Sequence, residues 1–361
     1  MRQGGAVKVA ALFVGAVIGA GFASGQEILQ FFGVHGRWGL YGALLTIAAF
    51  AGLGVKVQVT AVRLQAQNYR EVFDYFLGRR WSAVMDAASV CMLAGGLAVM
   101  MAGSGAVLHE QFGLPTWGGV MLLAALVILV LLHGLTGVVA VNVVLVPLKI
   151  ILVAGLSAAA VLLYDGPPPP ALARPDGISA SWLGSALLYV SYNMIVPVAV
   201  LSSLGRYLTI REAAAGAVLG GVILGCATTL VAYAILTYFP LVSGYQVPLL
   251  QVAGMVHPYS RMLISVVVWI AVFTTAVANA HGLVSRFAPQ GTLRYKRAGI
   301  CCTLLLLPLA FFKFSHLIGF IYSLFGYAGL VLLAAVAFHS AAGFWQRLKN
   351  RCQIAGHRGQ F

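Results

Sequence analysis

Two short stretches of this apolar chain combine residue types that could bind a ligand. The first reads GAVIGAGFASGQEILQFF, in which glycines at 15, 19, 21 and 25 are interleaved with or followed by polar residues. Unwinding over 19–24 would expose backbone N–H and C=O groups and leave a helix N-terminus near Gly25, a favourable place for a carboxylate. We therefore expect substrate contacts from these residues: Gly19, Ala20, Gly21, Ser24, Gln26 and Glu27.

Alternatives to this interpretation exist for the glycines and for Glu27. Glycines four residues apart also suit close packing of an unbroken helix. The polar residues that follow favour the break, because Gln and Glu at membrane depth are costly unless they line a cavity or meet a partner. Glu27 could stabilise the N-terminus of the broken helix, contact a substrate amine, or carry a proton. The sequence leaves these roles open.

The second stretch, LLYVSYNMIVPVAVLSSLG, contains a proline within an apolar helix. Pro197 removes the backbone hydrogen bond to residue 193 and crowds that carbonyl, so the helix is weakened beside Ser191, Tyr192 and Asn193. A simple proline kink is the alternative. If the helix is broken, Tyr189 and Tyr192 are candidate walls or gates over a small substrate, and Asn193 is a candidate hydrogen-bonding residue.

Three further polar residues could bind a proton or a small cation. Lys149 lies near the middle of an apolar window, too deep for simple snorkelling, and a buried lysine readily loses its proton. Thr274 and Thr275 are adjacent in WIAVFTTAVANAHGL and could ligate a small hard cation, although membrane-helix hydroxyls often bond their own backbone. His281 is expected to be a capping or interfacial residue, and no role is assigned to Asp86.

The composition places these residues in a bilayer. Of 361 residues, 61% are apolar and 8% charged, which excludes an ordinary soluble globular protein. A helix crosses a bilayer with roughly 20 apolar residues, so about ten crossings are available. The five cysteines show neither a disulfide framework nor a zinc spacing. The apolar windows fall at 6–33, 39–62, 82–108, 116–134, 137–164, 182–205, 213–239, 260–285, 298–312 and 315–339.

The net charge of +14 is explained by topology rather than by nucleic-acid binding. Lys and Arg concentrate in the segments that lie inside when the N-terminus is cytoplasmic, which predicts a multi-pass protein of the cell membrane with both termini in the cytoplasm. We retain the N-terminal apolar stretch as a first span because it lacks a convincing signal-peptide cleavage site. Segments 68–81 and 243–260 are expected to form short helices at the two membrane faces.

The two halves of the chain have matching layouts. Residues 7–164 and 182–339 are equal in length and each holds five spans, so the second half must enter the membrane from the opposite side. We predict an all-α integral membrane protein of ten transmembrane helices, arranged as two inverted five-helix repeats with spans 1 and 6 broken. Its parts are a first repeat at 1–164, an extracellular Pro-rich connector at 165–181, a second repeat at 182–339 and a basic cytoplasmic tail at 340–361.

The stretches GAVIGAGFASGQEILQFF, NYREVFDYFLG and FTTAVANAHG resemble the YkvI-type bacterial membrane proteins, permeases related to the amino acid–polyamine–organocation superfamily. The resemblance covers nearly the whole chain and implies a LeuT-like fold. It implies a sodium site formed by the carbonyls of Gly15, Ile18 and Ala271 with the Thr274 and Thr275 hydroxyls. A competing implication comes from Lys149, which resembles the lysine that, in proton-coupled relatives, places its amine where the sodium would sit. The run SYN departs from the Gly-aromatic-Glu pattern of relatives.

These observations favour a secondary active transporter of a small amino acid or related organic amine. A cation and an ammonium repel at one small site, so proton coupling through Lys149 is favoured, with sodium as the rival. A channel, or a non-transporting sensor on the same fold, is the alternative. We expect no enzyme activity, no catalytic residues, no cofactor beyond the coupling H+ or Na+, and no nucleic-acid partner. The expected partners are a small-molecule substrate and the lipid bilayer; the sequence does not indicate an oligomeric state.

Overall fold

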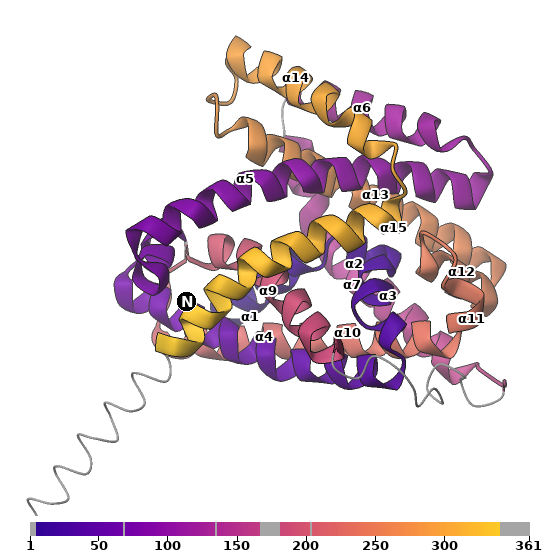
Figure 1. Ribbon diagram of the computed structural model, residues 1–361, viewed down its shortest axis with the longest axis horizontal. Coiled ribbons are helices and arrows are strands. Elements are labelled where there is room, and N and C mark those ends of the chain that lie inside the picture. Colours follow the sequence, from indigo (N-terminus) through magenta and orange to yellow (C-terminus); the bar gives the residue numbers. More distant parts are fainter. Residues whose placement is uncertain (1–4, 68, 134–135, 167–180, 203, 340–361) are drawn as a thin grey trace, which may run out of the picture.

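The computed structural model describes residues 5–67, 69–133, 136–166, 181–202 and 204–339 (Figure 1). All regular structure within these ranges is helical. Eight of the helices are long and apolar enough to cross a membrane. They are α4 (Arg37–Leu64), α5 (Tyr69–Phe112), α6 (Thr116–His133), α7 (Thr136–Leu162), α9 (Ser181–Ser202), α10 (Ile210–Thr237), α13 (Pro258–Val284) and the segment Phe314–His339.

The two remaining apolar windows of the sequence correspond to an interrupted segment and to a shorter helix. The interrupted segment consists of α1 (Gly5–Val17), α2 (Ala20–Ser24), α3 (Gln26–Phe31) and the short η1 (Gly33–His35). The shorter helix is α14 (Leu293–Ala310). Most of the predicted connector, 167–180, and the predicted tail, 340–361, lie outside the described residues.

Short helices form in both of the segments predicted to lie at the membrane faces. In the first, a positive φ of 75° at Gly78 kinks α5, so that the residues before it form a separate short helix. Its Val72, Phe73 and Phe76 are buried while Asp74 is exposed, which is an amphipathic pattern. The second segment contains α12 (Pro248–Val256), and the short α11 (Phe239–Val242) lies just before it. The two short helices are thus confirmed, and their position at the membrane faces stays a prediction.

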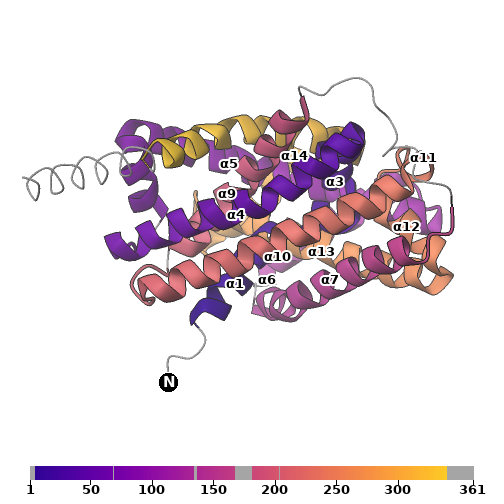
Figure 2. The ribbon, with the colours of Figure 1, turned by 90° about the horizontal axis from the view of Figure 1, so that it is seen from below.

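Three helices pack through glycines on one side of the molecule. Along α10, Gly221 lies against Ala51 and Gly225 against Ile47, so α10 runs antiparallel to α4. Figure 2 shows these two helices side by side along their lengths. The helix α1 packs on α10 in the parallel sense, since Gly216 meets Val9 and Gly220 meets Phe13. Small residues at a helix interface let two backbones approach closely, as is typical of membrane helices.

A second group of helices, α5, α6, α13 and α14, packs together on the other side (Figure 1). A chain of hydrogen bonds joins three of them: Trp269 Nε1 of α13 donates to Ser104 Oγ of α5 at 3.0 Å, and Ser104 Oγ donates to the Gly119 carbonyl of α6 at 2.8 Å. Ser104 and Gly119 belong to a close contact in which an added Cβ at Gly119 would lie 2.8 Å from the Ser104 carbonyl oxygen. Polar groups thus fix the register of this second group.

The expected break in span 6 is not present, and the prediction is corrected here. α9 is a continuous helix with Pro197 inside it. One missing backbone hydrogen bond is tolerated in a membrane helix when neighbouring groups supply others. Here the Asn193 side chain donates to the Tyr189 carbonyl at 3.0 Å, and Ser191 Oγ donates to the Gly326 carbonyl of the last span at 2.7 Å.

The close contact of α4 and α10 generates a stability prediction. An added Cβ at Gly221 would lie 2.5 Å from Ala51 Cα and 2.7 Å from the Phe50 carbonyl carbon. Gly221→Ala should therefore lower the free energy of unfolding by about 1–3 kcal/mol, because backbone cannot move aside as a flexible side chain can. The matched control is Gly52→Ala on α4, where a Cβ would meet nothing within 4 Å. Thermal unfolding in detergent compares the two, and equal midpoints would contradict the prediction.

Candidate functional site

The first span is interrupted at two places. α1 ends at Val17, Ile18 and Gly19 are not helical, and the Gly19 backbone is extended with φ −91° and ψ −166°. The second interruption is at Gly25, which is left-handed with φ 79°. The unwound part is thus narrower than the predicted 19–24, because Ala20–Ser24 forms the short helix α2.

Side chains satisfy backbone groups around the second interruption. Ser24 Oγ donates to the Gly21 carbonyl at 2.8 Å and accepts from the Gln26 N–H at 3.2 Å. This local bonding explains why 20–24 remain helical, since Ser competes well for backbone groups at helix ends. Gln26 is buried, and its Oε1 has no hydrogen-bond partner among the described residues.

The helix α12 covers the second interruption. At Gly25 an added Cβ would lie 2.8 Å from Leu249 Cγ and 3.2 Å from the Leu249 backbone nitrogen. Leu249 and Leu250 are fully buried, so α12 packs onto the broken span rather than lying free at the surface. The interruption at Gly25 is therefore covered by α12.

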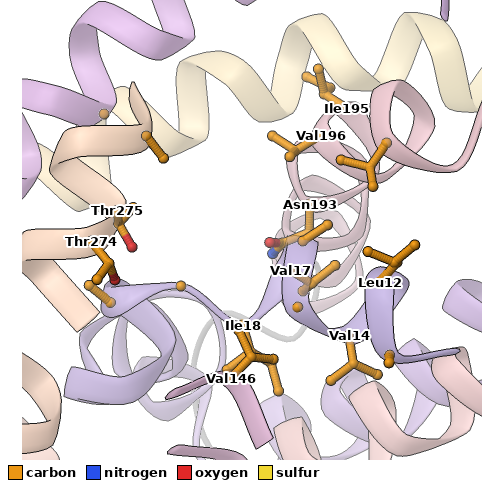
Figure 3. A pocket seen from close by; sticks show the side chains of 18 of the residues that line it. Leu12, Val14, Val17, Ile18, Val146, Asn193, Ile195, Val196, Thr274 and Thr275 are labelled. Atoms are coloured by element: carbon orange, nitrogen blue, oxygen red, sulfur yellow. The ribbon is translucent and has the colours of Figure 1, made fainter. Parts of the chain in front are cut away.

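A cavity of about 1000 Å³ lies beside the first interruption. Figure 3 shows Thr274 and Thr275 on one side of it and Asn193, Ile195 and Val196 on the opposite side. Its wall is mainly apolar. Of the residues predicted from the sequence, it is lined by Gly15, Ile18, Gly19, Ala20, Glu27, Lys149, Tyr192, Asn193, Thr274 and Thr275. Those outside its wall are Gly21, Ser24, Gln26, Tyr189, Ser191 and Ala271.

Glu27 is the acidic residue of the cavity wall. It is 4% exposed, and its Oε2 accepts a hydrogen bond of 2.7 Å from the Tyr192 hydroxyl. Its side chain folds back over α2: a Cβ at Gly21 would lie 2.7 Å from Glu27 Cδ. Gly21 thus serves the site indirectly by leaving room for the carboxylate.

Tyr322 is a cavity residue that the sequence pattern did not indicate. It ends a π-helical turn, η2 (Ile318–Tyr322), in the last span, a local irregularity that is frequent at functional sites. Its ring lies 5.1 Å from the ring of Tyr192, centroid to centroid, and both line the cavity. In the sequence, an aromatic residue within an apolar helix cannot be told from a core residue. The position of Tyr322 at the cavity becomes visible only once the course of the helix is known.

Tyr189 and Ser191 pack α9 against its neighbours instead of lining the cavity. The Tyr189 ring contacts Phe32 at 4.9 Å and Phe50 at 6.0 Å between centroids, and its hydroxyl lies 3.4 Å from Thr228 Oγ1. Ser191 Oγ is bonded to carbonyls of its own helix and of the last span. Tyr189 and Ser191 therefore fix the position of α9, whose Tyr192 and Asn193 line the cavity.

The residues expected to couple transport to an ion line the same cavity, with the exception of Ala271. Lys149 is 3% exposed, and no hydrogen bond or ion pair joins its ammonium to another described residue. Thr274 Oγ1 donates to the Ala271 carbonyl at 3.2 Å, the backbone bond that was the alternative to ion binding. Thr275 is partly exposed to the cavity. Lys149 and the two threonines therefore line the same cavity as the interruption at Ile18.

One end of the cavity is bordered by an ion-pair cluster around Asp86, which the sequence left without a role. Arg70 and Arg286 each lie 2.6 Å from an Asp86 carboxylate oxygen. The Tyr69 hydroxyl donates to the same carboxylate at 2.5 Å, and the Arg286 guanidinium lies over the Tyr69 ring. Tyr69 and Arg286 also line the cavity, as does the exposed Val7. The cluster fastens the short helix before Gly78 to α5 and α13.

The opposite end of α5 carries a second acidic residue that the sequence analysis missed. The Glu110 carboxylate accepts from the backbone N–H of Gln246 at 2.6 Å and of Val247 at 3.3 Å, just before α12. Arg261 donates to the Glu110 carbonyl at 2.7 Å, and the Phe314 N–H donates to the Gln246 side chain at 2.7 Å. These bonds tie α12, α13 and the last span to α5. An acidic residue at a helix C-terminus is unfavourable without such donors, which is the signal that could have found it.

The fold and the membrane-spanning helices define the class of the protein: it is an all-helical membrane protein with the LeuT fold. Two solved structures carry this assignment. MhsT in complex with L-phenylalanine matches with a TM-score of 0.59 over 92% of this chain and 88% of MhsT, at 17% identity. Mhp1 in its inward-facing conformation matches with a TM-score of 0.62 over 84% of this chain and 69% of Mhp1, at 15% identity.

Two proteins of Bacillus subtilis are similar to the chain over nearly its whole length. The membrane protein YkvI of Bacillus subtilis is 29% identical over 338 residues, covering 92% of this chain and 96% of YkvI. The protein YyaD of the same organism is 27% identical over 336 residues, covering 93% of this chain and 97% of YyaD. No family model matches the chain. The resemblance to YkvI-type proteins, drawn above from the motifs, is confirmed.

The geometry of the interruption predicts different responses at its two glycines. Gly25→Ala introduces a side chain at positive φ and a contact with Leu249, so it should lower the free energy of unfolding by about 1–3 kcal/mol. Gly19→Ala should be tolerated, because its backbone is extended and an added Cβ would first meet an atom at 4.0 Å. Thermal unfolding of both variants in detergent tests this, and the reverse order of stabilities would contradict it.

Proposed function

We propose that the protein is a secondary active transporter of a small amino acid or related organic amine, working by alternating access. The observation that carries the proposal is the cavity at the interruption of the first span, whose apolar wall includes a buried carboxylate, Glu27, and a buried lysine, Lys149. Ionisable residues at membrane depth are costly and are expected where a substrate or ion passes. Transporters with interrupted helices bind their substrates at such a place.

The two ends of the cavity support alternating access. One end reaches exposed residues, Val7 and Arg286, in the segments that the charge distribution assigns to the cytoplasm. Away from this end, α12 covers the broken span at Gly25, and Glu110 holds the backbone before α12. On this proposal the structure is an inward-open state of a protein with ten crossings, two inverted repeats and cytoplasmic termini. The antiparallel packing of α4 on α10, the second and seventh crossings, agrees with inverted repeats.

For the coupling ion, we favour the proton, carried by Lys149, over sodium. Lys149 has no partner among the described residues that would keep it charged, and an apolar wall favours the neutral amine. Sodium remains the rival, with Gly15, Ile18 and Ala271 carbonyls and the Thr274 and Thr275 hydroxyls as its ligands. Ala271 does not line the cavity, and its carbonyl already accepts from Thr274.

Transport itself is tested in proteoliposomes with radiolabelled amines and amino acids. We expect saturable uptake that depends on an imposed ion gradient and is abolished by Glu27→Gln. The control is Asp74→Asn, which removes a carboxylate charge at an exposed position away from the cavity. Unsaturable conductance would indicate a channel, and binding without flux would indicate a sensor; either result would contradict the proposal.

The coupling ion is tested by two sets of variants. If Lys149 carries the proton, Lys149→Met should make uptake independent of a pH gradient, whereas Lys56→Met, at a partly buried lysine of α4 outside the cavity wall, should retain the dependence. If sodium couples transport, Na+ should stimulate uptake by the wild type. The double variant Thr274→Val/Thr275→Val should then show no stimulation by Na+. Wild-type uptake that ignores Na+ and a Lys149→Met variant that still follows pH would each reject one of the two ions.

A further inference from the structure

The side chains in the corner of the cavity around Glu27 offer the negative charge of a carboxylate and several free hydrogen-bond acceptors. We call the group formed by Glu27, Tyr192, Asn193 and Tyr322 the acceptor corner; all four residues line the cavity. The Tyr192 hydroxyl already donates to Glu27, and the Asn193 amide nitrogen already donates to the Tyr189 carbonyl. Glu27 Oε1 and Asn193 Oδ1 then remain as acceptors. Two donors remain among these side chains: the second N–H of the Asn193 amide and the Tyr322 hydroxyl, which has no hydrogen bond to another described residue.

The backbone of α9 has one acceptor without its helical partner at the same residue, Asn193. Pro197 has no N–H, so the carbonyl of Asn193 lacks the helical partner that it would otherwise have. Pro197 does not break α9, but it leaves one backbone carbonyl of this helix without a backbone N–H donor. A carbonyl oxygen without a donor is costly inside a membrane unless a ligand or another group supplies one.

Aromatic faces complete the acceptor corner. The rings of Tyr192 and Tyr322 lie 5.1 Å apart, tilted by 39°, and Tyr192 also contacts Phe31 at 5.5 Å. A ring face attracts a cation through its quadrupole, and the attraction grows when water is excluded. A buried carboxylate beside two tyrosine rings is thus suited to an organic cation.

A carboxylate on the ligand would find few favourable neighbours in this corner. The side chain of Glu27 folds back over the first turn of α2, close to Gly21, so the negative charge of the protein is already next to the short helix. Of the cations in the wall, Arg286 is paired with Asp86 at 2.6 Å. Lys149 is the one described lysine of the wall, and it belongs to α7 rather than to the corner.

We infer that the ligand of this cavity is a primary organic amine without an adjacent carboxylate, whose ammonium group is bound in the acceptor corner and whose apolar body fills the apolar wall. A primary ammonium has three N–H donors and no acceptor, which matches the unpaired acceptors of the corner. This inference rests on the proposed function and narrows its substrate class, since it excludes zwitterionic amino acids.

Isothermal titration of the full chain in detergent tests the inference with matched ligands. Phenethylamine, L-phenylalanine and 3-phenylpropionate share one apolar body and carry an ammonium group, both charged groups and a carboxylate, respectively. We expect binding of phenethylamine alone, and the same preference for 3-methylbutylamine over L-leucine. Glu27→Gln should weaken amine binding roughly 30-fold or more, as expected for a buried charge that loses its partner. Tyr322→Phe should retain it and Tyr322→Leu should weaken it about three- to tenfold.

The control and the contradicting outcomes separate this inference from the proposed transport. Asp74→Asn should leave amine binding unchanged, and thermal unfolding of every variant checks that it is folded. Binding of L-phenylalanine or L-leucine as tightly as of the matching amine, lost in Lys149→Met, would overturn the inference while leaving the proposed transport standing. Absence of binding by any of the amines would overturn it as well. Amine binding without gradient-driven uptake would leave the inference standing and contradict transport.

Discussion

A helix that is interrupted inside a bilayer exposes backbone groups that no water is there to satisfy, and much of this structure follows from that constraint. The interruption at Ile18 and Gly19 is bordered by a cavity, where a ligand can meet the exposed groups. The interruption at Gly25 is covered by α12 and closed locally by Ser24. One break therefore faces the proposed ligand and the other is sealed by protein.

The same constraint explains the surroundings of three acidic residues, Glu27, Asp86 and Glu110. Asp86 receives two arginines and a tyrosine, Glu110 receives backbone N–H groups, and Glu27 receives only the Tyr192 hydroxyl. The first two carboxylates are well supplied with donors and join helices. Glu27 is the least satisfied of the three and is the one in the cavity. The unused acceptor capacity of Glu27 in an apolar chamber is the basis of the binding role proposed for it.

The sequence could predict the eight long apolar helices of the described residues and an interruption in the first span, because apolar length and glycine spacing are local properties. It could not predict whether Pro197 breaks α9, since that depends on whether Ser191 and Asn193 find carbonyls to bond, one of them in the last span. Tyr322 reaches the cavity because of a π-turn, which shifts the face of a helix without any residue-level signature. Glu110 was missed because its partners are backbone groups of a distant loop.

The glycine contacts between α4 and α10 have a mechanical consequence. Two backbones in direct contact at Gly221 and Gly225 cannot slide along each other, because the side chains next to these glycines would then clash with the opposing helix. Shear between these two helices is thereby suppressed, and α1 is locked to them through Gly216 and Gly220. If the protein changes the side to which its cavity opens, these three helices must move as one rigid body, with the displacement taken up at joints elsewhere.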